Sequence, residues 1–224
     1  IGTACGFSVI RGSTIYFFLP GVPREMTRMF ESSVMPLIKK ERPDDTLVRT
    51  AVLKIFGRTE SYCDQALGDL IKQEKEITFA FLPHYPEITI KLTIRGTDRK
   101  SLEKKLKAVE RKTTRILGDI VFGRDEETLE LVVGNLLQQA GATLALAESC
   151  TGGFITHRIT NVPGSSAYLE RALIVYSNRA KKELLSMPAS LLSKHGAVSE
   201  EAAAHMAREV RRLSKATIGL AVTG

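Results

Sequence analysis

Residues 144–153 read LALAESCTGG, and this stretch decides how the second half of the chain can fold. An apolar run ends at an acid, a serine and a cysteine, and a threonine and two glycines follow. A short apolar run bounded by turn residues is typical of a buried strand, and glycines permit a tight turn. The residues from about Gly153 to Asn161 have the composition of a helix. The stretch therefore predicts a strand, a turn and a helix in succession.

The composition limits the class of protein. The 224 residues are enough for one large or two small domains, and 43% hydrophobic and 25% charged residues are ordinary for a soluble globular protein. No apolar run reaches membrane-spanning length, and no signal peptide opens the chain. Cys5, Cys63 and Cys150 are widely spaced, which predicts reduced thiols and no disulfide framework or metal cluster. We therefore expect a cytoplasmic protein without a metal or another cofactor.

The net charge of +7 raises the question of a nucleic-acid partner. Residues 1–125 hold 22 Lys and Arg against 16 Asp and Glu, whereas residues 126–224 hold 10 against 9. The most basic segment, residues 98–115, has apolar side chains at helical spacing: Leu102, Leu106, Val109 and Thr113. An amphipathic helix with a solvated basic face is the favoured interpretation, and a nucleic-acid or other anionic partner the less favoured one.

The first half of the chain predicts two units. Residues 14–38 indicate a strand, a Pro-Gly turn and a helix, too little to bury a core of their own. After a polar connector at residues 39–46, a strand, helix, strand, strand, helix, strand pattern predicts a small α+β module over residues 46–123. Its clearest strand, residues 87–96, alternates apolar and polar side chains. The module lacks the G-x-x-G loop and stacking aromatic pair of an RNA-binding KH domain, which favours a spacer or dimerisation module.

Apolar strands alternate with helices in residues 126–224. The predicted strands are residues 143–147, 171–177 and 217–224, with helices before, between and after the first two. Pro188 can open one helix and Ser199 can cap another. This order predicts an α/β fold with a parallel sheet and helices on both faces.

Polar side chains lie at the carboxyl end of each of these strands. Residues 148–153 follow the first, Tyr176, Ser177 and Asn178 lie at the end of the second with Lys181 one helical turn later, and residues 223–224 end the third. Ligands bind outside the carboxyl ends of the strands in such sheets, so these groups are expected to meet in one crevice. Helix capping by Ser149 or Thr151 and a simple glycine turn are the structural alternatives.

Ser149 is the candidate nucleophile, because free N–H groups at a helix N-terminus would favour an oxyanion. His157 lies eight residues further along, about 12 Å away if the segment is helical, so it is a poor base for Ser149. Lys181 is the better base, because burial would lower its pKa, and Tyr176 could relay a proton. Cys150 is a rival nucleophile.

Small polar residues after the turn at Gly164, namely Ser165 and Ser166, could close over a ligand, and Arg171 could hold a phosphate or carboxylate. An ordinary loop and a structural arginine are the alternatives.

Several motifs resemble those of a known family. "AESCTGG", "GSSAYLERALIVYSNRAK" and "HGAVSEE" resemble the CinA C-terminal domain, the nicotinamide mononucleotide deamidase family. "GTACGF" and "FFLPGVPREM" resemble the end of the molybdopterin-binding-like α/β domain that opens CinA proteins, and the KH-like middle module matches in position. The resemblance implies a fragment cut at both ends, divided into residues 1–42, 46–123 and 126–224, the last an incomplete deamidase domain.

The resemblance also implies an activity: hydrolysis of the carboxamide of nicotinamide mononucleotide to nicotinate mononucleotide and ammonia. Ser149 would then be the nucleophile, Lys181 its base and Tyr176 a supporting hydroxyl. The positions implied around the nucleotide substrate are Glu148, Cys150, Thr151, Gly152, Gly153, Ser165, Ser166, Arg171 and Asn178. The family implies a homo-oligomer and, for the deamidase reaction, no metal. The composition and charge distribution disfavour a membrane or nucleic-acid partner. A non-catalytic nucleotide- or DNA-associated module linked to competence or damage response is the alternative function.

Overall fold

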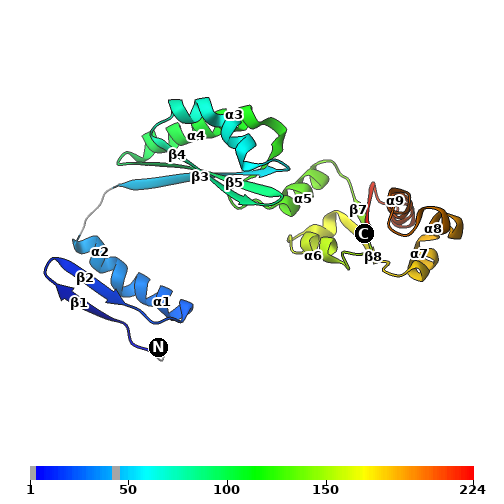
Figure 1. Cartoon of the computed structure of the whole chain (residues 1–224), viewed down its shortest axis with the longest axis horizontal. Coiled ribbons are helices and arrows are strands. Elements are labelled where there is room, and N and C mark those ends of the chain that lie inside the picture. Colours follow the sequence, from blue (N-terminus) through cyan, green and yellow to red (C-terminus); the bar gives the residue numbers. More distant parts are fainter. Residues whose placement is uncertain (1–3, 42–45) are drawn as a thin grey trace.

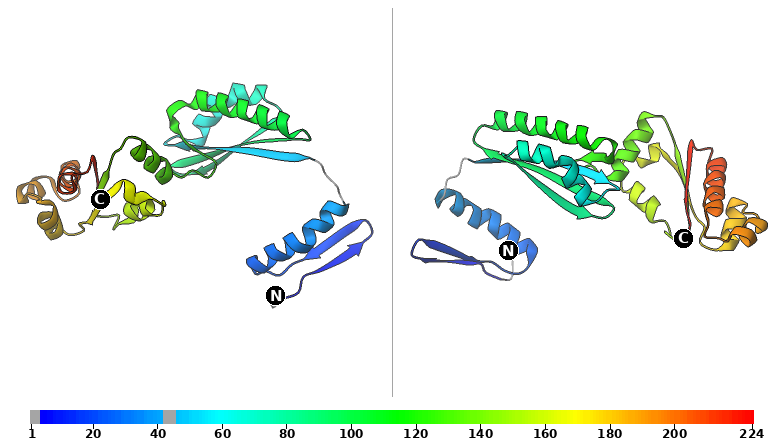
Figure 2. Two further views of the ribbon diagram at one scale, coloured as in Figure 1. Left: turned by 180° about the vertical axis from the view of Figure 1, so that it is seen from behind. Right: turned by 45° about the horizontal axis from the view of Figure 1, so that its top comes forward.

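The computed structural model describes residues 4–41 and 46–224, which form sheets of two, four and three strands (Figures 1 and 2). The connector predicted at residues 39–46 falls largely on residues 42–45, which lie outside the described residues. Residues 1–3 of the predicted first unit, and its last residue, 42, also lie outside them.

The first sheet is an antiparallel hairpin followed by one helical segment. The strands are β1 (Phe7–Arg11) and β2 (Thr14–Phe18), and the helical segment comprises α1 (Pro23–Met29), the π-helical η1 (Phe30–Val34) and α2 (Met35–Glu41). The strand and the helix predicted from residues 14–38 are present, but β1 was not predicted. Val34 is the only buried residue among residues 4–41, so this part buries as little as its length suggested.

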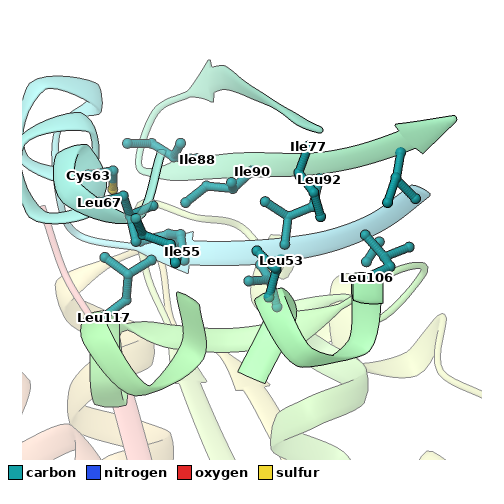
Figure 3. Close-up of a cluster of buried hydrophobic side chains, with 14 of the residues drawn as sticks. Leu53, Ile55, Cys63, Leu67, Ile77, Ile88, Ile90, Leu92, Leu106 and Leu117 are labelled. Carbon is teal, nitrogen blue, oxygen red and sulfur yellow. The ribbon is translucent and has the colours of Figure 1, made fainter. Parts of the chain in front are cut away.

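The second sheet is antiparallel, with strand order β4-β5-β3-β6. Its elements are β3 (Leu47–Phe56), α3 (Glu60–Gln73), β4 (Ile77–His84), β5 (Glu87–Gly96), α4 (Arg99–Leu117), η2 (Gly118–Ile120) and β6 (Val121–Arg124). Alternate residues of β5, from Ile88 to Ile94, are buried in one cluster with Leu53 of β3 and Leu67 of α3. Figure 3 shows Ile88, Ile90 and Leu92 beside these two side chains. The predicted period-2 strand and basic amphipathic helix are both confirmed, because α4 buries its predicted apolar stripe.

The basic helix α4 is, with 19 residues, the longest in the described part of the chain. Its outer face carries many charges. None of the helices in residues 4–41 and 46–224 has both the length and the apolar character needed to cross a membrane.

The third sheet is parallel, with β7 between β8 and β9. Its elements are α5 (Leu129–Gln139), β7 (Leu144–Glu148), α6 (Phe154–Thr160), η3 (Ser165–Ala167), β8 (Leu169–Ile174), α7 (Asn178–Leu185), α8 (Ala189–His195), α9 (Glu200–Ser214) and β9 (Ile218–Val222). The second strand was predicted at residues 171–177, but β8 ends earlier, because Ile174 pairs with the last residue of β7 and Ser177 caps α7.

Helices cover both faces of this sheet. Ala145 and Ala147 of β7 pack in one cluster with residues of α7 and α9. Leu144 and Leu146, which alternate with them, pack in another cluster with residues of α5 and α6. The predicted α/β fold with a parallel sheet between two helical layers is therefore confirmed, and Figure 2 shows α9 beside β9.

We predict that Gly219→Ala in β9 lowers the free energy of unfolding. A Cβ at Gly219 would lie 2.1 Å from the carbonyl oxygen of Ala207 and 2.7 Å from Cβ of Arg211, both on α9. Relief of this overlap requires the helix to move off the sheet, and overpacking of this kind costs roughly 1–3 kcal/mol. Urea denaturation of the variant measures the loss.

Gly68→Ala in α3 is the control, because a Cβ at Gly68 has no neighbouring atom within 4 Å. In a helix interior this change adds about 0.5–1 kcal/mol of stability. Equal stability of Gly219→Ala and the wild-type protein would contradict the close approach of α9 to β9.

Candidate active site

Ser149 and Lys181 meet at the carboxyl end of the parallel sheet. Nζ of Lys181 donates a hydrogen bond to Oγ of Ser149 over 2.8 Å. Both residues are buried, with 5% and 2% of their surface exposed. The structure therefore brings together two of the side chains that the sequence singled out, from positions 32 residues apart.

Each of these side chains is positioned by its own element. Ser149 directly follows β7, and its N–H donates to the carbonyl of Val222 on β9 over 2.9 Å. Lys181 lies one turn into α7, whose start is capped by Ser177, which accepts a hydrogen bond from the N–H of Ala180 over 3.0 Å. The helix then turns Lys181 and Leu185 toward the interior, where both are buried.

Burial lowers the pKa of the Lys181 ammonium, because an apolar interior disfavours the charged form. A charge on the neighbouring Cys150 acts in the opposite direction. The net lowering enlarges the fraction of neutral amine at any given pH. A neutral amine can accept the proton of the Ser149 hydroxyl, which is the activation that a serine nucleophile needs.

The ends of the three strands lie side by side, as the order of elements predicted. Glu148 at the end of β7 pairs in register with Ile174 of β8 and Val222 of β9. Beyond β9, Oγ1 of Thr223 donates to the carbonyl of Ala197 over 2.8 Å. A Cβ built on Gly224 would lie 3.2 Å from the sulfur of Cys150, so this end of the chain passes next to the turn after β7.

Tyr176 contributes a different group from the one expected. Its carbonyl oxygen accepts a hydrogen bond from Nζ of Lys181 over 3.2 Å, whereas the residue is 75% exposed. Within the described residues its hydroxyl has no hydrogen bond to Ser149 or Lys181. The supporting hydroxyl therefore stays a prediction, and the contact that exists orients Lys181 through the backbone.

The two alternatives to the Ser149–Lys181 pair lie close in sequence. Cys150 is exposed and has a free thiol, but it makes no hydrogen bond to a base among the described residues. His157 lies on α6, where its ring nitrogen Nε2 is 3.3 Å from the side-chain amide of Asn161. The structure does not bring His157 to Ser149.

Glu148 has a different environment from the one expected of a substrate-binding residue. The residue is 1% exposed. Oε2 accepts hydrogen bonds from Oγ1 of Thr151 and from the N–H groups of Gly153 and Ile155, and Oε1 accepts from the N–H and hydroxyl of Thr156. These bonds also use the N–H groups at the start of α6 that the sequence analysis expected to be free for an oxyanion, and that expectation is wrong.

The turn between β7 and α6 needs its glycines. Gly152 and Gly153 have φ values of +58° and +98°, a region that disfavours residues with a Cβ. A Cβ on Gly153 would also lie 2.9 Å from Cδ1 of Ile174. Thr151, Gly152 and Gly153 thus lie next to Ser149, and Asn178, the first residue of α7, lies three residues before Lys181.

Ser165, Ser166 and Arg171 do not join this group. The serines belong to η3, which precedes β8, and Arg171 pairs in register with Ala145 near the start of β7. Nη1 of Arg171 donates to the carbonyl of Leu213 near the end of α9 over 3.2 Å. These residues lie toward the amino end of the parallel sheet, whereas Ser149 follows its carboxyl end, so their role in substrate binding stays a prediction.

The sequence analysis missed Thr156. Both its N–H and its hydroxyl donate to Oε1 of Glu148, over 2.7 and 2.5 Å. An acid that ends an otherwise apolar strand, followed by a threonine in the first turn of the next helix, is the signal that could have found it.

No group of three or more His, Cys, Asp or Glu side chains suited to a metal ion is present in the described residues.

Comparison with known proteins agrees with the resemblance of the motifs. The family model described as the CinA C-terminal domain matches residues 126–224, and the model described as the damage-inducible protein CinA KH domain matches residues 50–123. A CinA-like protein of Geotalea daltonii is 44% identical over all of this chain, which covers 54% of that protein. A putative competence-damage inducible protein of Halothermothrix orenii is 41% identical, with the same coverage.

Solved structures in the comparison include the competence/damage inducible protein CihA from Agrobacterium tumefaciens. It is 36% identical, with a TM-score of 0.42, over 43% of this chain and 58% of that one. The competence damage-inducible protein A (ComA) from Klebsiella pneumoniae is 33% identical, with a TM-score of 0.41, over 41% and 57%.

This chain spans about half the length of the curated relatives it matches. Its two family matches lie in order and without overlap, and together they cover most of its residues. The chain belongs to the CinA family.

Proposed function

We propose that residues 126–224 hydrolyse the carboxamide of nicotinamide mononucleotide, which gives nicotinate mononucleotide and ammonia. Ser149 is the nucleophile and Lys181 its general base. The proposal includes the division of the chain into residues 1–42, 46–123 and 126–224, the first a part of a molybdopterin-binding-like domain. It also includes a nucleotide as the substrate, action in the cytoplasm and assembly into a homo-oligomer.

One observation carries this proposal: the 2.8 Å hydrogen bond between two buried side chains, Lys181 and Ser149, beside three strand ends. A lysine is seldom buried without a reason, because removal of its charge from water is unfavourable. Here the buried amine lies against a hydroxyl instead of a carboxylate. That pairing suits proton transfer better than it suits an ion pair.

The chemistry follows from this pair. Neutral Lys181 takes the Ser149 proton as Oγ attacks the carboxamide carbon, and the resulting ammonium returns that proton to the leaving nitrogen. The C–N bond breaks, ammonia leaves and an ester on Ser149 remains. Water then attacks the ester with Lys181 again as base, which releases the carboxylate and restores the serine. The overall change is one amide and one water to one acid and one ammonia.

The oxyanion formed in each attack needs hydrogen-bond donors. The N–H groups of Ser149, Gly152, Gly153 and Phe154 already donate to acceptors within the protein. Among the described residues of this turn, the N–H groups of Cys150 and Thr151 have no such acceptor. They are our candidates for the donors to the carboxamide oxygen.

Ser149→Ala is expected to abolish ammonia release from nicotinamide mononucleotide, because it removes the attacking oxygen and leaves the rest of the site in place. Cys150→Ala is the matched control at the next position and should retain most of the activity. An enzymatic ammonia assay on the purified intact protein measures both.

Undiminished turnover in Ser149→Ala would refute the serine as nucleophile. Loss of activity in Cys150→Ala alone would move the nucleophile to the thiol. A wild-type protein that releases no ammonia but binds DNA in a salt-sensitive manner would favour the non-catalytic alternative.

The rate should depend on pH through Lys181. As general base Lys181 must be neutral, so kcat/KM should rise with pH and level off above the pKa of the free enzyme's lysine. Since burial lowers that pKa, the midpoint should lie below about 10.4, the value of an exposed lysine. Lys181→Gln should be nearly inactive, and its residual kcat/KM should not show this rise with pH. A pH–rate profile without a rising limb would exclude the lysine as base.

Lys181→Met tests the same group through stability. In the wild-type protein the folded-state pKa of Lys181 lies below its unfolded-state value, so the unfolded chain binds more protons between the two values. Stability therefore rises with pH in that window, by up to about 1.4 kcal/mol per pH unit. Methionine does not titrate, so the wild-type protein should gain stability relative to the variant as pH increases.

Urea denaturation of both proteins at several pH values below 10 measures the difference. At the acid end of the range, Lys181→Met should be the more stable protein, because the buried ammonium is gone. A stability difference that stays constant with pH would contradict the lowered pKa.

A further inference from the structure

Five hydrogen bonds converge on the buried carboxylate of Glu148. Three of them come from the turn and the first residues of α6 to Oε2, over 2.7 Å from Thr151, 3.0 Å from Gly153 and 3.1 Å from Ile155. The other two come from Thr156 to Oε1. An ionised carboxylate offers about four lone-pair sites, so this one has no capacity left for a substrate.

The charge of Glu148 is consistent with these contacts. Burial by itself would raise the pKa of this carboxyl, but the hydrogen bonds from Thr156, Thr151 and the backbone outweigh burial, and the net pKa lies below the usual value. The side chain therefore stays ionised and acts only as an acceptor. It is unsuited to give or take a proton during the reaction.

Glu148 and Ser149 are consecutive, and they face opposite layers of the sheet. Side chains alternate along a strand, and Glu148 continues the series of Leu144 and Leu146 toward α6. Ser149 faces the other layer, where Lys181 lies. The backbone between them is held on both sides, because the Glu148 carbonyl accepts from the N–H of Val175 over 2.8 Å and the Ser149 N–H donates to Val222.

We propose that Glu148 is a positioning residue for the proposed reaction: its carboxylate ties the turn and the start of α6 to the end of β7. This holds Ser149 against Lys181. It also fixes the N–H groups of Cys150 and Thr151, because the residues on either side of them are held by hydrogen bonds. The inference rests on the proposed function of Ser149. It adds that the position of Ser149 relative to Lys181 is fixed by the contacts of Glu148 on the opposite face of the sheet.

The test compares Glu148→Gln with Glu130→Gln in the intact protein. The glutamine at position 148 would point an N–H₂ donor at donors that now meet an oxygen. Glu130 is the matched control, since its side chain is also largely buried and forms an ion pair with Arg158 of α6, whereas the hydrogen bonds from Thr151 and Gly153 of the turn go to Glu148. Both changes remove one carboxylate that holds α6.

In Glu148→Gln we expect kcat for ammonia release to fall on the order of 100-fold, the loss that a nucleophile misplaced by about 1 Å brings. KM should change far less, because Glu148 does not contact the substrate. Glu130→Gln should lose stability but keep its kcat. Folding of both variants is checked by circular dichroism. A folded Glu148→Gln with the kcat of Glu130→Gln would overturn the proposal.

If Glu148→Gln does not fold, Thr156 provides the second comparison. Thr156→Val has nearly the same shape but lacks the hydroxyl that donates to Glu148, whereas Thr156→Ser retains it. The valine variant should lose kcat and the serine variant should recover it. Equal kcat values in the two variants would also overturn the proposal.

A readout that needs no substrate separates this proposal from the proposed function. Phenylmethanesulfonyl fluoride, a general reagent for activated serines, should modify Ser149 in the wild-type protein, and mass spectrometry follows the rate. Modification of Ser149 without ammonia release would reject nicotinamide mononucleotide as the substrate, but the role of Glu148 could still be tested by the rate of modification. Slower modification in Glu148→Gln than in the wild-type protein would support the proposal that Glu148 positions Ser149. Ammonia release that survives Ser149→Ala would reject the function and this inference together.

Discussion

The candidate site depends on how the central strand of the parallel sheet ends. β7 is buried along its whole length between β8 and β9, so its last residue cannot shift along either neighbour. At this point two consecutive side chains diverge to opposite layers, Glu148 toward α6 and Ser149 toward α7. The end of β7 thus connects the buried carboxylate of Glu148 in one layer with the candidate nucleophile Ser149 in the other. Helix α6 packs on the side of Glu148 and helix α7 on the side of Ser149.

The buried lysine connects function with stability. Lys181 lies among the apolar residues of the layer formed by α7 and α9, with Leu185 and Met187 buried nearby. An ammonium there is unfavourable, and folding tolerates it because the lowered pKa lets the amine become neutral and because Ser149 and the Tyr176 carbonyl accept its hydrogen bonds. Active sites often hold such destabilising groups, since the property that is unfavourable for folding is the one the chemistry needs.

The three parts of the chain differ in how well local pattern predicted them. The boundaries of β5 agree with the predicted ones, and the helix predicted after the first strand of this module is present as α3, because a helical stripe and a strict alternation face one well-packed core. The strand β1 was missed, since FSVIR is short and has both faces exposed in this structure. The end of β8 was placed late, because Val175 and Tyr176 are residues that favour strands, while only pairing with β7 decides where the ladder stops.

By itself the sequence determined the alternation of strands and helices, the glycine turn after β7, and Ser149 and Lys181 as candidates, because each depends on periodicity or on residue chemistry that is local to the chain. The tertiary structure alone decided the direction of each side chain. It buried Glu148 under hydrogen bonds from the turn and α6, and it left Tyr176 exposed. It placed Ser165, Ser166 and Arg171 toward the other end of the sheet. These outcomes depend on which elements pack against each residue, and that information is distributed over the whole fold.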